Sequence, residues 1–240
     1  MSCDSKGTRL SFTCKHLLIQ NNTQPLVDIA FSFQHSFALI GESGSGKSLT
    51  LKALLGMVPH ALDVTFEYDA SYQLKRGANI AFVPQNPFTA LSPLTKIGKQ
   101  FMATKEIAQM YLHKVALEND MLERFPSELS GGQLQRIIIA MALALEPKLL
   151  LLDEPTTALD EESKANVLAL IHQLQQQCQF DLLFVTHDIA TIEHICDEVG
   201  IIKQGIMLES GAITDILHSP KNAYTKQLIA SGFRQRSFRA

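Results

Sequence analysis

The sequence predicts an α/β protein whose central sheet is largely parallel. Short apolar runs with the composition of buried strands alternate along the chain with longer segments of helical spacing. The clearest pair is the run LLLLD at residues 149–153 and the helical pattern over residues 161–176. The 240 residues, of which 46% are hydrophobic and 19% charged, can bury a sizeable core and exclude a disordered chain, a coiled coil and a collagen.

The first third of the chain is expected to be rich in strands. Residues 10–20 and 26–33 predict two strands around the turn-like segment at residues 21–25. A third short strand over residues 37–40 leads directly into Gly41, and a helix is expected over residues 48–55. Two further apolar stretches, residues 64–68 and 80–83, predict strands.

The amino-acid composition and the spacing of apolar residues change in the middle of the chain. From Leu94 to Arg124 glycine is rare, and Lys, Glu, Ala and Leu recur at helical spacing. This pattern predicts a helical subdomain, over about residues 87–136, inserted into the sheet domain. Beyond it we expect helices over residues 131–145, 161–176 and 189–195, strands over 149–153 and 182–186, and a hairpin of strands 198–203 and 206–210. The chain is thus expected to form one domain over residues 9–230, with a short basic tail over 231–240.

Charge, cysteine content and hydropathy exclude several classes of protein. The net charge of −3 gives no indication of a nucleic-acid partner. No apolar run reaches the roughly 18 to 20 residues of a membrane helix, and the N-terminal residues do not resemble a secretory signal. The four cysteines form no CxxC pair, which favours reduced thiols in a cytosolic protein: Cys3, Cys14, Cys178 and Cys196.

A phosphate-binding loop is predicted at residues 41–48, which read GESGSGKS and match the pattern G-x-x-x-x-G-K-[ST]. Glycines at this spacing let backbone N–H groups turn toward phosphates, and the following helix places its N-terminus there. Lys47 is expected to reach the β- and γ-phosphates, and Ser48 to hold Mg²⁺. The residues expected to bind nucleotide are Gly41, Glu42, Ser43, Gly44, Ser45, Gly46, Lys47, Ser48 and Leu51.

Two carboxylates follow the apolar strand at residues 149–152. Ligands of open α/β sheets bind at the C-terminal ends of strands, so Asp153 is a candidate for the Mg²⁺ shell and Glu154 for polarising a water molecule. His187 ends another apolar strand and could hydrogen-bond the γ-phosphate. Each pattern also has a plain structural interpretation, since strands often end in charged or polar turns.

Residues 129–133 read LSGGQ and precede an apolar helix. Ser130, Gly131, Gly132 and Gln133 would form a second anion-binding nest, which makes sense if it faces the ATP of another subunit. With this segment the chain resembles the ATP-binding cassette (ABC) ATPases over residues 10–228. The family's elements occur in their usual order: Walker A at 41–48, the Q-loop at Gln85, the signature at 129–133, Walker B at 149–154, the D-loop at Asp160 and the H-loop at His187.

The resemblance implies a P-loop NTPase core with an N-terminal antiparallel β part, and a mechanism that uses ATP and Mg²⁺. Two cassettes would sandwich two ATP molecules, with Walker A of one subunit facing the signature of the other. It further implies that Glu154 is the general base, that His187 senses the γ-phosphate and that Asp160 couples the two sites. Ser48, Gln85 and Asp153 would attend Mg²⁺. The aromatic residue that often stacks on adenine is missing from residues 18–23, and Phe12 and His16 are the nearest substitutes.

Within the family, the segment RFPSELSGG before and across the signature resembles importers. Among importers, the loop GESGSGKS, the run LLLLDEPTTALD and the tail SPKNAYTKQLIAS resemble the peptide and nickel uptake ATPases. This implies a peripheral subunit on the cytoplasmic face of the inner membrane. Its partners would be a second, identical or different cassette, two membrane permease subunits and an extracytoplasmic solute-binding protein. Nickel or another metal complex and peptides both stay open as cargo, and the alternative is a soluble ABC ATPase with a mechanical or regulatory role. The basic end, Lys221, Lys226, Arg234, Arg236 and Arg239, is either a solvated tail or a contact with anionic lipid.

Overall fold

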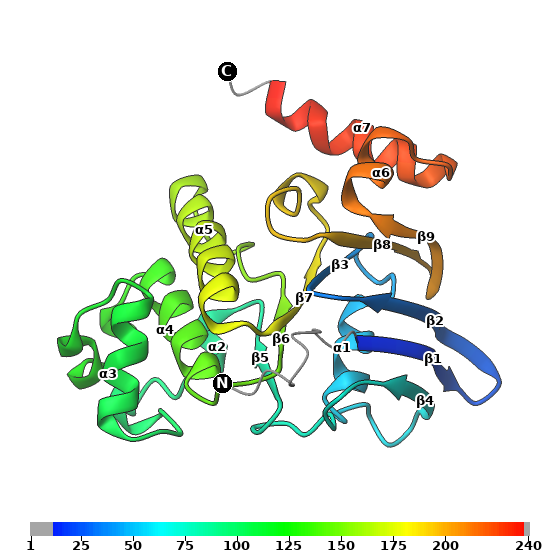
Figure 1. Ribbon diagram of the computed structural model, residues 1–240. Helices are drawn as coiled ribbons and strands as arrows, with labels where there is room; N and C mark the ends of the chain where they lie inside the picture. The colour runs from blue at the N-terminus through cyan, green and yellow to red at the C-terminus, as the bar shows by residue number, and fades with distance from the viewer. Residues whose placement is uncertain (1–11, 238–240) are drawn as a thin grey trace, which may run out of the picture. The chain divides into compact units, whose positions relative to one another are not determined.

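The computed structural model describes residues 12–237, and in that range the side chains of all residues except 190 and 232–237 (Figure 1). The chain divides into two compact units, one made of Met1–Leu74 with Leu183–Ala240 and the other of Lys75–Leu182. The expectations for the first eleven residues, including Cys3, and for Arg239 lie outside the described residues.

The first unit holds a mixed sheet with the strand order β4-β1-β2-β9-β8-β3. Strand β1 pairs in antiparallel fashion with both β2 and β4, whereas β3 runs parallel to β8 (Figure 1). The antiparallel β part predicted for the N-terminal region is therefore confirmed. The strands are β1 (Phe12–Asn21), β2 (Gln24–Phe33), β3 (Ser36–Ile40), β4 (Asp63–Asp69), β8 (Glu198–Lys203) and β9 (Ile206–Ala212).

Aromatic rings form much of the core of this sheet. The ring centroids of Phe12 and Phe33 lie 5.5 Å apart, and those of Phe31 and Phe37 lie 4.9 Å apart. Phe12, Phe33 and Phe37 are each exposed by at most 2%. Because side chains alternate between the faces of a strand, the apolar residues of β2 at every second position all reach this core. The packing fixes β3, which ends at the candidate phosphate-binding loop.

The helices of the first unit follow its strands. They are α1 (Lys47–Leu54), η4 (Ile189–Thr191), α6 (Ile213–His218) and α7 (Ala223–Ser237). The helix expected over residues 189–195 is wrong, since only one short 3₁₀ turn forms there. The backbone of α7 continues to Ser237, so that the segment expected to be a tail begins inside a helix. The start of α7 is capped by Asn222, whose Oδ1 accepts the N–H of Tyr224 at 2.8 Å.

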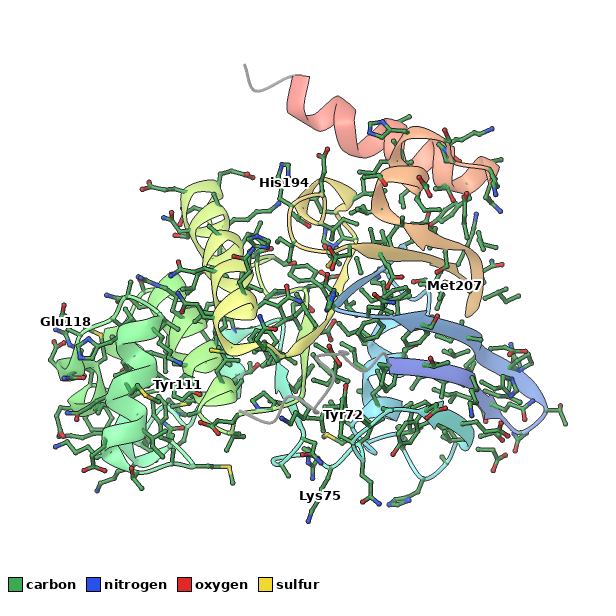
Figure 2. The ribbon with its side chains drawn as sticks, viewed as in Figure 1. Tyr72, Lys75, Tyr111, Glu118, His194 and Met207 are labelled. Carbon is green, nitrogen blue, oxygen red and sulfur yellow. The ribbon has the colours of Figure 1, made fainter. Side chains whose placement is uncertain are left out.

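The second unit combines two parallel strands with several helices. Strands β5 (Ile80–Val83) and β6 (Leu149–Asp153) pair in parallel, and the four leucines of β6 are fully buried. The α-helices are α2 (Pro87–Ala90), α3 (Lys105–Lys114), α4 (Gly131–Leu143) and α5 (Glu161–Cys178), and the 3₁₀ helices are η1 (Ile97–Lys99), η2 (Asn119–Glu123) and η3 (Pro126–Glu128). Helix α4 packs against α2, α3 and α5. Tyr111 of α3, labelled in Figure 2, is 4% exposed.

Strand β7 (Asp181–Thr186) crosses the boundary between the units, and all six of its residues are buried. The cysteines that the structure describes, Cys14, Cys178 and Cys196, are free thiols, as the sequence predicted. Burial raises the pKa of Cys14 to about 12 and also raises the pKa of Cys196, which keeps both thiols protonated. None of the helices within residues 12–237 combines the length and the apolar composition needed to cross a membrane.

Candidate functional site

The loop of residues 41–48 connects β3 to α1 and has the backbone of a phosphate cradle. Gly44 and Gly46 have φ angles of 79° and 109°, which L-residues with a side chain rarely adopt. A Cβ atom on Gly41 would lie 2.2 Å from the carbonyl oxygen of Ile202, and one on Gly46 would lie 2.9 Å from Cγ2 of Val27. Close packing therefore requires glycine at both 41 and 46, and the backbone conformation requires it at 46 as well.

Lys47 supplies a buried positive charge to this loop. Its side chain is 5% exposed, and Nζ donates to the carbonyl oxygens of Gly41 at 2.7 Å and Glu42 at 3.0 Å. Ser45, between the two left-handed glycines, keeps a buried hydroxyl that has no hydrogen-bond partner among the described residues. A glycine cradle at a helix N-terminus with a buried ammonium suits a polyphosphate. The side chain of Leu51, also expected to bind nucleotide, is 1% exposed and belongs to the core.

The acidic end of β6 lies in the second unit and brings two predicted residues together. The Oε2 atom of Glu154 accepts hydrogen bonds from Nε2 of Gln85 at 3.2 Å and from Oγ1 of Thr157 at 3.0 Å. Glu154 has a φ angle of 46°, an unusual conformation for a residue with a side chain. Strain of this kind gathers at functional sites, where surrounding contacts hold it. Gln85 and Glu154, to which the family resemblance assigned an Mg²⁺ role and the general-base role, are thus brought together, whereas Thr157 was not predicted.

The signature segment forms the N-terminus of α4. Ser130 is the N-cap, and its Oγ accepts the N–H of Gln133 at 3.2 Å while Oε1 of Gln133 accepts the N–H of Ser130 at 2.9 Å. Gly131 and Gly132 are the first two residues of this helix. Helix α4 therefore presents N–H groups and the positive end of its dipole at the residues predicted to bind an anion.

Asp160 caps the next helix, α5. Ser163, to which Asp160 is hydrogen-bonded, lies beside the signature. The Oδ1 atom of Asp160 accepts the N–H of Ser163 at 2.9 Å and its Oδ2 accepts the hydroxyl of Ser163 at 2.8 Å. The backbone hydrogen bond from Ser163, followed by the bond from its hydroxyl, holds the pKa of Asp160 below its ordinary value. A Cβ atom on Gly132 would lie 3.3 Å from Oγ of Ser163. Ser163, which was not predicted, thus bonds to Asp160 and lies next to Gly132 of the signature.

His187, Phe12 and His16 lie in the first unit. His187 directly follows β7 and its side chain is exposed. Phe12 is fully buried among aromatic rings, so its proposed role as a substitute for stacking on adenine is wrong. His16 is partly exposed, and its Nε2 lies 3.0 Å from Oδ1 of Asp28. Gln85, Asp153, Glu154, Asp160 and the signature belong to the second unit.

Comparisons with known proteins agree with this set of features. A family model described as ABC transporter matches residues 26–157, more than half of the chain. The Metal-staphylopine import system ATP-binding protein CntD of Staphylococcus aureus (strain NCTC 8325 / PS 47) is 38% identical over 249 residues, which cover 91% of this chain and 92% of that protein. The Oligopeptide transport ATP-binding protein OppD of Bacillus subtilis (strain 168) is 35% identical over 223 residues, covering 82% of this chain and 62% of that protein.

Solved structures show the same fold. The structure of cbiO1 from Clostridium perfringens, described as part of the ABC transporter complex cbiONQ, superimposes with a TM-score of 0.72. The match covers 95% of this chain and 94% of that chain at 22% sequence identity, and it concerns the fold alone. It agrees with the α/β fold class predicted from the sequence.

Proposed function

The chain belongs to the ABC transporter family as an ATP-binding, ATP-hydrolysing member, and from this membership we propose that it powers a bacterial importer of a metal complex or of peptides. The observation that carries the proposal is the 38% identity to CntD across 91% of the chain, because that relative is the ATP-binding protein of a metal-staphylopine import system. The similarity to OppD supports an importer of the same group and keeps peptides as a second cargo class. These relatives favour the importer over a soluble ATPase without transport.

In this proposal the residues of the first unit bind and sense the nucleotide. Lys47 and the N–H groups of the loop at residues 41–48 hold the β- and γ-phosphates, and His187 hydrogen-bonds the γ-phosphate. The buried ammonium and the left-handed glycines support the role of the loop. His187 follows a fully buried strand, which supplies a rigid base for an exposed imidazole.

The residues of the second unit carry the hydrolytic chemistry. Glu154 accepts a proton from the attacking water, and Gln85 and Thr157 orient its carboxylate through the hydrogen bonds described above. Ser48, Gln85 and Asp153 offer hydroxyl, amide and carboxylate oxygens, the ligand types that Mg²⁺ prefers. Mg²⁺ held by these residues would supply positive charge that neutralises the charge developing on the phosphates.

A second cassette completes each site. The capped N-terminus of α4, with Ser130, Gly131 and Gly132, contacts the ATP held by the partner cassette, and Asp160 couples the two sites. The hydrogen bonds of Ser163 to Asp160 and its closeness to Gly132 support this coupling, because they join the two elements within one unit. The partner cassette is either a second copy of this chain or a related subunit.

The other partners are two permease subunits and an extracytoplasmic solute-binding protein, with the chain bound peripherally to the cytoplasmic face of the inner membrane. The test is an affinity pull-down of the tagged Glu154→Gln variant from detergent-solubilised membranes of a producing cell, with ATP and Mg²⁺, analysed by mass spectrometry. Recovery of two permeases, a cassette partner and a binding protein would support the importer. Recovery of soluble proteins alone would contradict it and favour the non-transport ATPase.

A further inference from the structure

The turn between β8 and β9 touches the phosphate-binding loop from outside. Gly205 in this turn donates its N–H to the carbonyl oxygen of Ser45 at 2.9 Å. The carbonyl oxygen of Gly205 in turn accepts the N–H of Asp28, on β2, at 2.7 Å. The N–H of Gly205 therefore bonds to the loop and its C=O bonds to β2, so that Gly205 links the two. Gly205 lies far from both segments in the sequence.

Only glycine fits at this position. Gly205 has a φ angle of 80°, in the left-handed region. A Cβ atom there would lie 2.1 Å from the carbonyl oxygen of Leu26 and 3.1 Å from Cα of Val27. A Cβ on Gly46 would in turn lie 3.6 Å from Cα of Gly205. The turn, β2 and the loop thus meet backbone against backbone with no space for a side chain.

The hydrogen bond from Gly205 reaches Ser45, the residue of the loop that has a flexible glycine on each side. Ser45 lies between Gly44 and Gly46, whose left-handed φ angles are accessible because glycine has no Cβ. Within the loop, the N–H of Ser45 donates to the carbonyl oxygen of Glu42 at 3.2 Å. The bond from Gly205 restrains the opposite side of the same residue, its carbonyl group. It thereby limits the orientations that the neighbouring N–H groups can take.

The turn itself is firmly held. Lys203 pairs with Ile206 across the hairpin, and Gln204 adopts a φ angle of 49°. On β9, Met207 (Figure 2) packs with its sulfur 2.8 Å from where a Cβ on Gly200 would lie. A restraint on a functional loop is effective only when its own support is rigid. The β8–β9 hairpin is supported on both sides within the sheet, because β8 pairs with β3 and β9 pairs with β2.

We propose that Gly205 is a positioning residue for the phosphate-binding loop. Its N–H fixes the carbonyl of Ser45, so the loop's own N–H groups are already oriented when a nucleotide arrives, and less free energy is lost in ordering them. The inference rests on the proposed role of residues 41–48 in nucleotide binding. It predicts that a change at Gly205 weakens nucleotide affinity in a chain that still folds.

The test compares Gly205→Ala with Gly56→Ala in the full chain. Gly56 has a φ angle of 63° in the same unit, but a Cβ there meets nothing within 4 Å, so this control carries the backbone strain without the contact. The dissociation constant for a fluorescent ATP analogue and the thermal unfolding midpoint are measured for both. We expect both midpoints to fall, but only Gly205→Ala to raise the dissociation constant, by about two- to tenfold, the range for one lost hydrogen bond. A folded Gly205→Ala variant with wild-type affinity would overturn the proposal.

Amide hydrogen exchange on the unaltered chain gives a second test, which decides the matter if Gly205→Ala does not fold. The N–H of Gly205 should be protected without nucleotide and more strongly protected when ATP is bound. Rapid exchange, or protection that ATP leaves unchanged, would overturn the positioning role. A wild-type chain that binds no ATP analogue would overturn the nucleotide site as well, whereas normal wild-type binding with an unaffected Gly205→Ala variant refutes only the role of Gly205.

Discussion

Ser130 has two possible roles, as a cap of α4 and as a ligand of the partner cassette's ATP, and a matched pair of variants separates them. Thr104 caps α3 in the same unit, where its Oγ1 accepts the N–H of Ile107 at 3.4 Å. Ser130 caps α4 with its Oγ accepting the N–H of Gln133 at 3.2 Å, and both caps are exposed. Replacing either residue by alanine removes one capping bond, which costs about 1 kcal/mol of stability. In a chain of this length that lowers the unfolding midpoint by about 2 to 4 °C.

The functional effect should differ between the two variants. A hydrogen bond from a hydroxyl to a charged phosphate contributes about 1.5 to 3 kcal/mol, so its loss should lower ATP turnover by about 10- to 100-fold. The assay is steady-state ATP turnover of the assembled complex, measured beside thermal unfolding. We expect equal losses of stability, with reduced turnover only for Ser130→Ala. If both variants retain the same turnover, Ser130 acts as a helix cap and the argument for the signature as a phosphate ligand is refuted.

Three further predictions concern the loop, the base and the α5 cap. Lys47→Ala should abolish binding of a fluorescent ATP analogue, because the loop loses its only buried ammonium among the described residues; tight binding by this variant would rule out the phosphate-loop role. Glu154→Gln should retain ATP binding while turnover falls by about 10²- to 10⁴-fold, the usual contribution of a general base, and unchanged turnover would mean that another group takes the proton. Because the folded pKa of Asp160 lies below its ordinary value of 3.8, ionised Asp160 stabilises the fold above that value and this contribution is lost as the pH falls through the folded pKa. Chemical unfolding of Asp160→Asn should therefore show a smaller loss of stability than the wild type on acidification below about pH 4, and identical pH profiles would contradict the assignment.

The sequence could predict the strands around the phosphate-binding loop because their signals are local. The strand expected over residues 37–40 is found at Ser36–Ile40, and the expected helix over 48–55 at Lys47–Leu54. Apolar runs that end at glycine identify both elements without knowledge of their neighbours. The β8–β9 hairpin followed in the same way from the Gln204-Gly205 pair between two apolar stretches.

The helix expected over residues 189–195 failed for a reason that apolar spacing does not reveal. Ile189, Ile192 and Ile195 are all buried, as helical spacing required. Local polar bonds nevertheless compete with the helix, since the N–H of Asp188 donates to Oγ1 of Thr186 at 3.0 Å and Oγ1 of Thr191 donates to the carbonyl of Asp188 at 2.7 Å. The buried isoleucines therefore reach the core from a series of turns.

In the candidate site, too, local motifs predicted some residues, whereas contacts between segments distant in the sequence could not be predicted. The family resemblance implied roles for both Gln85 and Glu154 in ATP hydrolysis, and a hydrogen bond joins the two side chains in the structure. Thr157 and Ser163 were missed because threonine and serine are common at helix starts, and only the folded chain shows which carboxylate each of them contacts. The bond from Gly205 to Ser45 joins segments that are distant in the sequence, so a pattern of hairpin residues could not indicate it.

The central claim, that ATP hydrolysis by this chain drives import, is tested most directly in the complete complex reconstituted into proteoliposomes. The measurement is ATP turnover with and without the solute-binding protein, using either the wild-type chain or Glu154→Gln at this one subunit. We expect the binding protein to raise turnover of the wild-type complex, and the Glu154→Gln substitution to remove that increase. An ATP turnover rate that changes neither with the binding protein nor with the Glu154→Gln substitution would contradict the claim.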